Sequence, residues 1–259
     1  MSDPGVVRRG ALARLLAARG FVRVADASLE LGVSEVTIRA DLTTLERQGR
    51  AVRVHGGAMP ADPLIREAPV EATRDQRAAA KDAIGAAAAA LVGSGDCIYL
   101  DAGSTALAVA GHLIERRELH DVIVVTSALT IALALEPAIP RFDVIVTGGT
   151  LRPLQHSLVN PFAAPMLASL RFDLALIGCN GIHPRDGVTN VNLPEAEVKR
   201  LAMRSAQRSV LVADGSKLLR TDPAVIGVLA DFERLITAGD TPPGAIDALR
   251  TAGLEVTAA

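Results

Sequence analysis

The segment LDAGSTALA, residues 100–108, has the composition of a turn that binds an anion. An apolar run ends at Leu100, a short polar stretch follows, and a helix-forming segment comes next. The first backbone N–H groups of a helix have no partner inside it and lie at the positive end of its dipole, so they bind phosphate well. Such a turn serves an enzyme that acts on a phosphorylated substrate or a sensor that only binds one. The turn alone does not decide between the two.

Polar residues follow several other apolar segments in the same way. Strand-like runs at 97–100, 122–126, 143–147, 173–178, 209–214, 225–230 and 234–238 alternate with helical patterns at 77–92, 105–116 and 194–206. This alternation predicts an α/β fold with a Rossmann-like, mostly parallel sheet and helices on both faces. Ligands bind beyond the carboxyl ends of such strands. Each residue after a strand can also be ordinary turn chemistry. The candidate ligand-binding residues are Asp101, Gly103, Ser104, Thr105, Thr126, Ser127, Gly149, Arg152, Asn180, Asp214 and Lys217.

Charged residues on two predicted helices are further candidates. Lys81 lies on the same helical stripe as Ile84, so we expect its ammonium group to need an anionic partner or to reach the edge of the sheet. Glu195 and Lys199 are four residues apart near the start of a helix. A capping box between Asn192 and Glu195 with a surface pair between Glu195 and Lys199 explains this spacing equally well.

The first sixty residues have the pattern of a helix-turn-helix. Helical segments are predicted at about 7–18 and 24–31, and a third begins after Ser34, whose hydroxyl can cap it. In the third segment the apolar residues form one stripe, and the opposite face is small and polar, which suits entry into the major groove; a solvated helix face is the alternative. Residues 49–59 alternate and contain a double glycine, as in a two-stranded wing. The candidate DNA-binding residues are Ser34, Val36, Thr37, Arg39, Ala40, Thr43, Arg47, Arg53 and His55.

The span LGVSEVTIRADLTTLERQGRAVRVHGGAM resembles the amino-terminal winged helix-turn-helix of the DeoR family of bacterial transcription regulators. The family usually has Arg where this chain has Ala40. A missing phosphate or guanine contact costs about 1–3 kcal/mol of discrimination, so we expect an altered operator or weaker binding.

The remainder of the chain resembles the DeoR-family effector domain. The motifs LDAGST, TGGTLR, LVNPFA, LIGCNGI, EAEVKR and VADGSK occur in the family's order, and that domain is similar in fold to ribose-5-phosphate isomerase. The resemblance implies an effector pocket that contains Lys81, Glu195 and Lys199 together with the residues after the strands. The family has Thr-Asn-Ser at 126–128 and Gly-Pro at 160–161, so the two departures here leave the identity of the sugar open.

The isomerases need carboxylates for proton transfer, and this chain lacks them at the matching positions. The acidic residues of the isomerase motif fall on Ile177, Asn180 and Gly181. We therefore expect a sensor rather than an enzyme: a DNA-binding repressor of a carbohydrate-metabolism operon, released by a phosphorylated sugar. Its partners would be double-stranded operator DNA and further copies of itself, as a dimer or tetramer. The alternatives are an activator, a sensor of a non-phosphorylated sugar or polyol, and an active phosphosugar isomerase with a DNA-binding head.

Composition and charge limit the domain organisation and the cellular setting that we expect for this chain. We divide the chain into a DNA-binding domain at 1–58, a proline-containing linker at 59–75 and an effector domain at 76–259. Residues 8–55 hold nine arginines against five acids, so this part carries +4 and the rest −6 of the net −2. The longest apolar run, 86–92, is far shorter than the roughly 20 residues that span a bilayer. The start also lacks a signal peptide, so we expect a cytoplasmic protein without membrane contact. Cys97 and Cys179 lie in apolar segments and are expected to be buried thiols, with no metal or cofactor.

Overall fold

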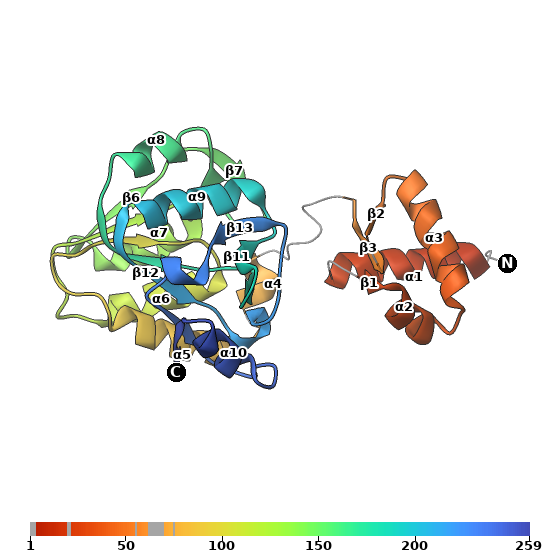
Figure 1. The fold of residues 1–259 in the computed structure, drawn as a ribbon. Coiled ribbons are helices and arrows are strands. Elements are labelled where there is room, and N and C mark those ends of the chain that lie inside the picture. Colours follow the sequence, from red (N-terminus) through yellow and green to blue (C-terminus); the bar gives the residue numbers. More distant parts are fainter. Residues whose placement is uncertain (1–3, 20–21, 55, 62–69, 75) are drawn as a thin grey trace. The chain divides into compact units, whose positions relative to one another are not determined.

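A computed structural model describes residues 4–19, 22–54, 56–61, 70–74 and 76–259. The chain forms two compact units, Met1–Ala68 and Pro69–Ala259, which are described separately (Figure 1). Among the helices in these ranges, none has both the length and the apolar character needed to cross a membrane.

Unit 1 contains the three helices that the sequence predicts and a small sheet. The elements are α1 (Pro4–Arg19), β1 (Val22–Arg23), α2 (Val24–Leu31), α3 (Glu35–Arg47), β2 (Ala51–Val54) and β3 (Gly57–Pro60). The sheet has the order β1-β3-β2, so β2 and β3 form the expected wing and β1 adds a strand that was not predicted. The Ser34 hydroxyl accepts a hydrogen bond from the backbone N–H of Thr37 at 3.2 Å, which confirms the predicted cap of α3.

The predicted apolar stripe of α3 is the core of unit 1. Ile38, Leu42 and Leu45 are fully buried against α1. Asp41 is buried beside them, and its Oδ2 lies 2.5 Å from Nε of Arg8 on α1. Apolar packing and this ion pair together fix which face of α3 is turned outward.

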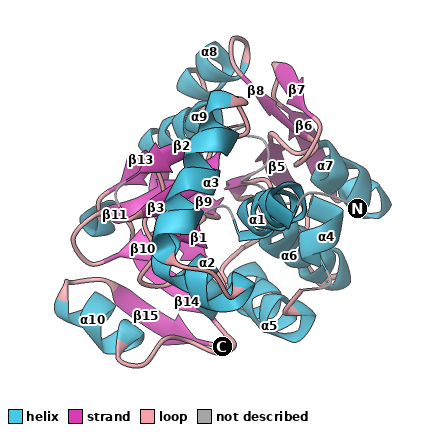
Figure 2. Cartoon of the chain, turned by 90° about the vertical axis from the view of Figure 1, so that its right-hand side faces the viewer, coloured by secondary structure: helices cyan, strands magenta, loops and turns pink. Residues whose placement is uncertain are grey.

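Unit 2 is built on one parallel sheet of seven strands in the order β15-β14-β12-β9-β4-β5-β6 (Figures 1 and 2). Its strands are β4 (Cys97–Leu100), β5 (Val122–Thr126), β6 (Phe142–Val146), β9 (Phe172–Ile177), β12 (Ala206–Val212), β14 (Arg234–Thr237) and β15 (Glu255–Ala258). Six of the predicted strands therefore lie in this sheet, whereas β15 was missed. The predicted α/β class with a parallel sheet is confirmed.

The order of the strands creates one topological switch point. From β4 the chain continues to β5 and β6 on one side, and it then returns to the other side of β4 with β9, β12, β14 and β15. Neighbouring connections therefore leave β4 and β9 in opposite directions, and ligands of such sheets bind beyond the carboxyl ends of the strands at this point. The sheet topology places a ligand site at this point.

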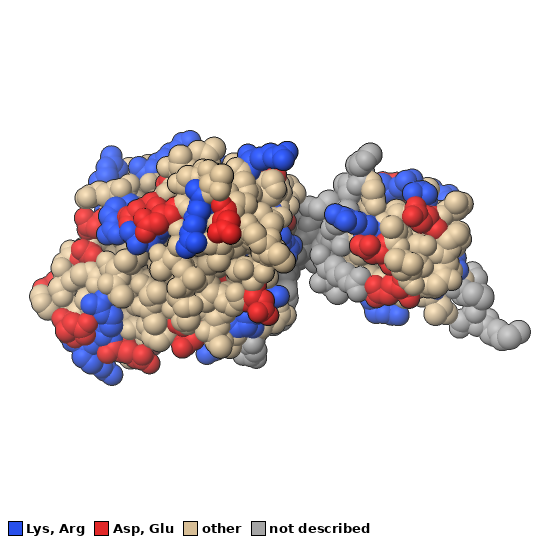
Figure 3. Space-filling view, turned by 60° about the horizontal axis from the view of Figure 1, so that its bottom comes forward, with Lys and Arg blue, Asp and Glu red and all other residues tan. Residues whose placement is uncertain are grey.

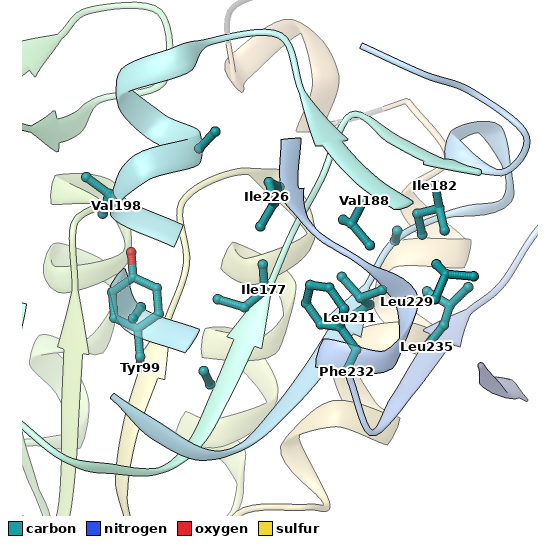
Figure 4. Close-up of a cluster of buried hydrophobic side chains, with 14 of the residues drawn as sticks. Tyr99, Ile177, Ile182, Val188, Val198, Leu211, Ile226, Leu229, Phe232 and Leu235 are labelled. Atoms are coloured by element: carbon teal, nitrogen blue, oxygen red, sulfur yellow. The ribbon is translucent and has the colours of Figure 1, made fainter. Parts of the chain in front are cut away.

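Helices cover both faces of the sheet. Side chains of α5, α6 and α7 form one buried cluster, and side chains of α8, α9 and α10 belong to the other. The helices of unit 2 are α4 (Val70–Arg74), α5 (Ala78–Ala89), α6 (Ser104–Glu115), α7 (Leu129–Leu135), α8 (Ala163–Ala168), α9 (Leu193–Arg204) and α10 (Ala245–Thr251), with short 3-10 turns at Glu136–Ala138, Gly215–Lys217 and Leu229–Asp231. In β4, Ile98 and Leu100 join the first cluster while Tyr99 joins the second, as alternation along a strand requires (Figure 4).

Two smaller sheets complete unit 2. They contain β10 (Gly181–His183), β11 (Gly187–Asn190) and β13 (Ala224–Gly227), and β7 (Thr150–Arg152) with β8 (Ser157–Val159). The prediction that 225–230 belongs to the main sheet is wrong, because β13 pairs antiparallel with β11. Its residues alternate between buried and exposed, which is typical of an antiparallel strand with one covered face.

Candidate functional site

The outward side of α3 presents the face that was predicted to meet DNA. This reading face consists of Val36, Ala40, Thr43 and Arg47; Val36 is 73% exposed, and Ala40 and Arg47 are exposed as well. Val36, the large apolar side chain of this face, is therefore exposed in unit 1. The small side chains beside it leave room for the edge of a DNA groove. The geometry fits a helix that enters the major groove.

The wing is joined to the reading face. Arg53 on β2 donates a hydrogen bond to the Thr43 hydroxyl at 3.2 Å, and its backbone N–H donates to Glu46 on α3 at 3.0 Å. Arg39 forms an exposed ion pair with Glu35, one turn earlier, at 2.6 Å. Thr37 and Ser34 serve the helix cap. His55 lies outside the described residues.

In unit 2 the switch point between β4 and β9 is bridged by a buried ion pair. Asp101, directly after β4, accepts a hydrogen bond from the backbone N–H of Gly178, directly after β9, at 2.9 Å. Nζ of Lys199 on α9 lies 2.7 Å from the same Asp101 oxygen and donates to the Gly178 carbonyl at 3.0 Å. Both charged side chains are at most 5% exposed, so α9 is tied to the strand ends through them.

A second buried pair lies one turn earlier on α9. Glu195 pairs with Arg152 of β7, accepts a hydrogen bond from the Ser157 hydroxyl of β8 at 2.8 Å, and accepts another from Asn190 at 3.2 Å. Asn192 caps α9 by accepting from the Glu195 backbone N–H at 3.1 Å. Only this half of the expected capping box is seen, because the Glu195 carboxylate contacts other residues. The expected surface pair is not formed either, because Glu195 and Lys199 are both buried and have other partners.

Asp101, Arg152, Glu195 and Lys199 form what we call the switch-point cluster, two acids and two bases whose charges sum to zero. Burial raises the pKa of Asp101 in spite of Lys199. Burial also acts against ionisation of Glu195, but Lys199 and Arg152 outweigh it and lower the pKa of Glu195. Burial disfavours the Lys199 ammonium, yet Asp101 and Glu195 raise its pKa overall. Mutual pairing thus favours the charged forms of Glu195 and Lys199, whereas burial outweighs it at Asp101.

The turn that follows β4 has the expected form. Gly103 precedes α6 with φ 114° and ψ 172°, a conformation that is essentially restricted to glycine. Its carbonyl accepts the first helical hydrogen bond, from Leu107 at 3.0 Å, and Ser104 and Thr105 form the first turn, half-buried. The turn therefore presents the amino end of a twelve-residue helix next to Asp101 at the switch point.

The hydroxyls after β5 have internal partners. Thr126 accepts a hydrogen bond from the Ala128 backbone N–H at 3.1 Å, and the Ser127 hydroxyl lies 3.2 Å from that of Tyr99. Burial raises the pKa of Tyr99, so its phenol stays neutral. Thr126 and Ser127 therefore both form hydrogen bonds within the protein at the end of β5.

Asp214 and Lys217 follow β12 on the far side of β9. Asp214 caps the 3-10 turn by accepting from the Ser216 backbone N–H at 3.0 Å, and it lies 3.7 Å from Arg77. Burial opposes ionisation of Asp214, but the hydrogen bond from Ser216 and the charges of Lys217 and Arg77 lower its pKa overall. The half-buried Lys217 and the half-exposed Arg77 thus bring positive charge to the end of β12, and we call these two residues the rim of the candidate site.

Three candidates have a structural explanation. A Cβ on Gly149, where φ is 144°, would lie 1.8 Å from the Val159 carbonyl oxygen, so the close approach of β7 and β8 requires glycine. The Asn180 side chain accepts from the Val191 backbone N–H at 3.0 Å. Lys81 is buried as predicted, and its ammonium donates to the carbonyls of Thr73 and, at 2.6 Å, Gln76.

A surface cavity of about 540 Å³ lies between α4, α5 and α6. It shares only Ser104 and Lys81 with the predicted pocket and is otherwise lined by helix residues such as Arg74 and His112. The cavity thus reaches Ser104 of the β4–α6 turn, whereas the residues of the switch-point cluster do not line it. Elsewhere on unit 2, acidic and basic side chains are interspersed on the face shown in Figure 3.

Several residues that lie against the candidates were not predicted from the sequence. Thr73, Arg77, Ser157 and Asn190 all contact a predicted site residue. Asn190 stands five residues before Glu195, and Ser157 five after Arg152, but neither follows a strand of the main sheet. A search for polar residues directly after parallel strands therefore does not find Ser157 or Asn190. Cys179 also adjoins the cluster, and burial raises its pKa to about 12.

Comparison with known families decides what kind of protein this architecture belongs to. Residues 8–63 match the DeoR-like helix-turn-helix domain, and residues 76–239 match the DeoR C terminal sensor domain. The chain belongs to the DeoR family. As a member, it is a DNA-binding transcriptional regulator with a carboxy-terminal sensor domain.

DeoR-family relatives match along nearly the whole chain. The HTH-type transcriptional repressor CsqR of Escherichia coli K12 is 31% identical, over 93% of this chain and 90% of the relative. The glycerol-3-phosphate regulon repressor of Haemophilus influenzae is 30% identical, over 94% of this chain and 93% of the relative. Among solved structures, ribose 5-phosphate isomerase A of Methanocaldococcus jannaschii is 18% identical over 53% of this chain and 52% of that chain, with a TM-score of 0.39. The α/β fold of unit 2 is therefore assigned from its own strand order and not from this similarity.

Proposed function

We propose that this DeoR-family regulator represses genes of carbohydrate metabolism and leaves its operator when a phosphorylated sugar binds at the switch point of unit 2. The observation that carries the proposal is the β4–α6 turn, where the amino end of α6 lies next to the buried ion pair of Asp101 and Lys199. The names of the two relatives support repression and a phosphorylated effector, because both are called repressors and one is named for a phosphorylated three-carbon polyol.

On the DNA side, the reading face of α3 would enter the major groove while Arg53 and Arg47 contact phosphates. The Ala40 side chain is a methyl group, so the centre of the reading face would contribute apolar contact, for example to a thymine methyl, instead of the bidentate contact of an arginine. A single unit 1 is too small and too weakly charged to hold an operator alone, so the chain would act as a homo-oligomer on repeated half-sites.

On the sensor side, the phosphate of the effector would lie against the first turn of α6, where Ser104 and Thr105 offer backbone N–H and hydroxyl donors. Lys217 and Arg77 would supply charge from the rim, and the switch-point cluster would contact the sugar hydroxyls. The four cluster residues hold one another in place, so they offer the ligand a preformed surface.

We further propose that the sugar binds without reaction. The three positions that match the isomerase acids have structural roles here: Ile177 is fully buried, Asn180 accepts a backbone hydrogen bond, and Gly181 pairs with Thr189 in a hairpin. Glu195 is held as a carboxylate by two cations, which makes it a weak base for removing a carbon-bound proton.

The test combines ligand-induced stabilisation with operator binding. Glycerol 3-phosphate, ribose 5-phosphate and hexose 6-phosphates are compared with their non-phosphorylated counterparts in thermal unfolding of the full chain. A true effector at a hundred times its Kd raises the unfolding free energy by about 2.7 kcal/mol. It should also weaken binding to duplexes from the promoter region adjacent to the gene. Stabilisation by the non-phosphorylated compounds alone would contradict the proposed phosphate site.

The DNA side has its own readout. The logarithm of the operator affinity should fall linearly with the logarithm of the salt concentration, with a slope of about −0.9 for each phosphate contacted. A flat dependence would contradict the role proposed for the arginines of unit 1.

A further inference from the structure

The short helix α4 is the first described element of unit 2 after the boundary with unit 1. Any signal that passes along the chain from the sensor to the DNA-binding unit must therefore pass through it. Its start is fixed by Val70, which is 4% exposed and whose backbone N–H donates to the Leu154 carbonyl of the β7–β8 turn at 2.8 Å.

The end of α4 touches the turn proposed to hold the phosphate. The hydroxyl oxygens of Thr73 and Ser104 lie 3.4 Å apart, within hydrogen-bond distance. The single Thr73 hydroxyl proton is shared between the Val70 carbonyl, at 2.9 Å, and the Ser104 hydroxyl, so Thr73 links the backbone of α4 to the first residue of α6. In this contact Thr73 donates and Ser104 accepts, so an anion that takes the Ser104 proton and turns the Ser104 hydroxyl toward itself displaces the acceptor that Thr73 uses.

The residues that follow α4 are fixed in a similar way. The buried Lys81 ammonium on α5 donates to the carbonyls of Thr73 and Gln76, so it ties α5 to the end of α4. Arg77, which has a left-handed φ of 56°, extends to Asp214 at 3.7 Å. The segment from Val70 to Lys81 therefore contacts two separate candidate effector residues, Ser104 on one side and Asp214 on the other.

We infer that α4 is the coupling element of this regulator and that Thr73 is its sensing residue, which detects occupancy of the β4–α6 turn through Ser104. The inference rests on the proposed phosphate site. Binding of phosphate at the turn withdraws the Ser104 hydroxyl from Thr73 and draws Arg77 away from Asp214. The segment 70–81 then changes its hydrogen bonding, and this change reaches the covalent connection to unit 1. Thr73 is a positioning residue and contacts no ligand itself.

The experiment follows amide hydrogen exchange of the full-length chain with and without inorganic phosphate, against sodium chloride at equal ionic strength. In the wild type we expect phosphate to slow exchange in peptides that cover 101–107 and to change exchange in peptides that cover 70–81. In Thr73→Val, which keeps the shape of the side chain, we expect the effect at 101–107 to persist and the effect at 70–81 to be lost.

Two further variants make the result specific. Thr73→Ser retains the hydroxyl and should restore the response at 70–81. Thr257→Val removes the hydroxyl of another half-buried threonine, on β15 at the edge of the sheet, and should behave like the wild type. Operator release by an effector found in the stabilisation assay should fall from about fivefold or more in the wild type toward none in Thr73→Val, and recover in Thr73→Ser.

The outcomes separate the two claims. If phosphate leaves 101–107 unchanged in the wild type, the phosphate site itself is wrong. If phosphate protects 101–107 while 70–81 does not respond, or responds equally in Thr73→Val, the site stands and the coupling role of α4 is overturned. If Thr73→Val unfolds, Thr73→Ser decides: a full response supports the hydroxyl link, and a lost response contradicts it.

Discussion

Replacing Lys199 by Met is the most direct test of the switch-point cluster. The methionine fills a similar volume but leaves Asp101 buried without its cation, since the two atoms of the ion pair lie 2.7 Å apart and neither side chain is more than 5% exposed. Breaking a buried pair in this way costs about 3–5 kcal/mol, and the remaining hydrogen bond from Gly178 to Asp101 points to the lower end.

The assay is thermal and urea unfolding of the full chain, followed by a signal from unit 2. A loss of about 3 kcal/mol should lower Tm by roughly 6–12 °C for a unit of this size. The double variant Lys199→Met with Asp101→Asn should recover at least about 1 kcal/mol relative to Lys199→Met, since the buried charge is removed and an acceptor for Gly178 remains. Lys217→Met, a half-buried lysine at the rim, is the matched control and should cost less than about 1 kcal/mol.

Two results would contradict the coupling of Lys199 with Asp101. Equal stability of Lys199→Met and Lys217→Met would mean that the ion pair contributes nothing once desolvation is included. Simple addition of the costs of Lys199→Met and Asp101→Asn in the double variant would mean that the two side chains are not coupled.

Three further predictions follow from the described contacts. Gly149→Ala should destabilise unit 2 by about 2 kcal/mol or more in urea unfolding, because its Cβ would meet the Val159 carbonyl at 1.8 Å, whereas Gly111→Ala, in open space on α6, should gain up to about 1 kcal/mol. Glu195 has a lowered pKa when folded, so its stabilisation is present above an unfolded pKa of about 4.3 and is lost as pH falls through the folded value; Tm measured from pH 7 to pH 3 should therefore fall less steeply in Glu195→Gln. Ala40→Arg should change operator affinity by about 1–3 kcal/mol at the base pair it faces, as measured by fluorescence anisotropy on a set of single-base operator variants; equal changes on all duplexes would indicate a phosphate contact instead.

Local patterns predicted the elements of the fold well where one physical signal dominated. The stripe of α3 and its Ser34 cap depend on residues a few positions apart, and β4 and β5 are apolar runs buried on both faces, so each could be predicted from its own segment. β15, with the sequence EVTA, is short and half polar, and only pairing with β14 makes it a strand. The apolar run of β13 fits a parallel or an antiparallel strand equally well, so its sheet could not be assigned in advance.

The candidate site was harder to predict, because its partners are far apart in the chain. Glu195 and Lys199 have the spacing of a surface pair on a helix, and only the fold shows that each instead meets a residue from another element, Arg152 and Asp101. The stripe that contains Lys81 correctly indicated burial, but the partners of its ammonium are carbonyls of a turn that no periodicity marks. The sequence thus shows which strand ends carry polar residues, but it does not show which charged residues pair with each other.

The zero net charge of the switch-point cluster has a consequence for the phosphate site proposed beside it. A phosphate dianion at the first turn of α6 brings two negative charges that the cluster does not neutralise, and low permittivity raises the electrostatic cost of that excess. Protonation of the phosphate near pH 6, or contact with Arg77 and Lys217, would reduce this cost. Binding of a phosphorylated effector should therefore tighten on mild acidification and weaken as added electrolyte screens Arg77 and Lys217.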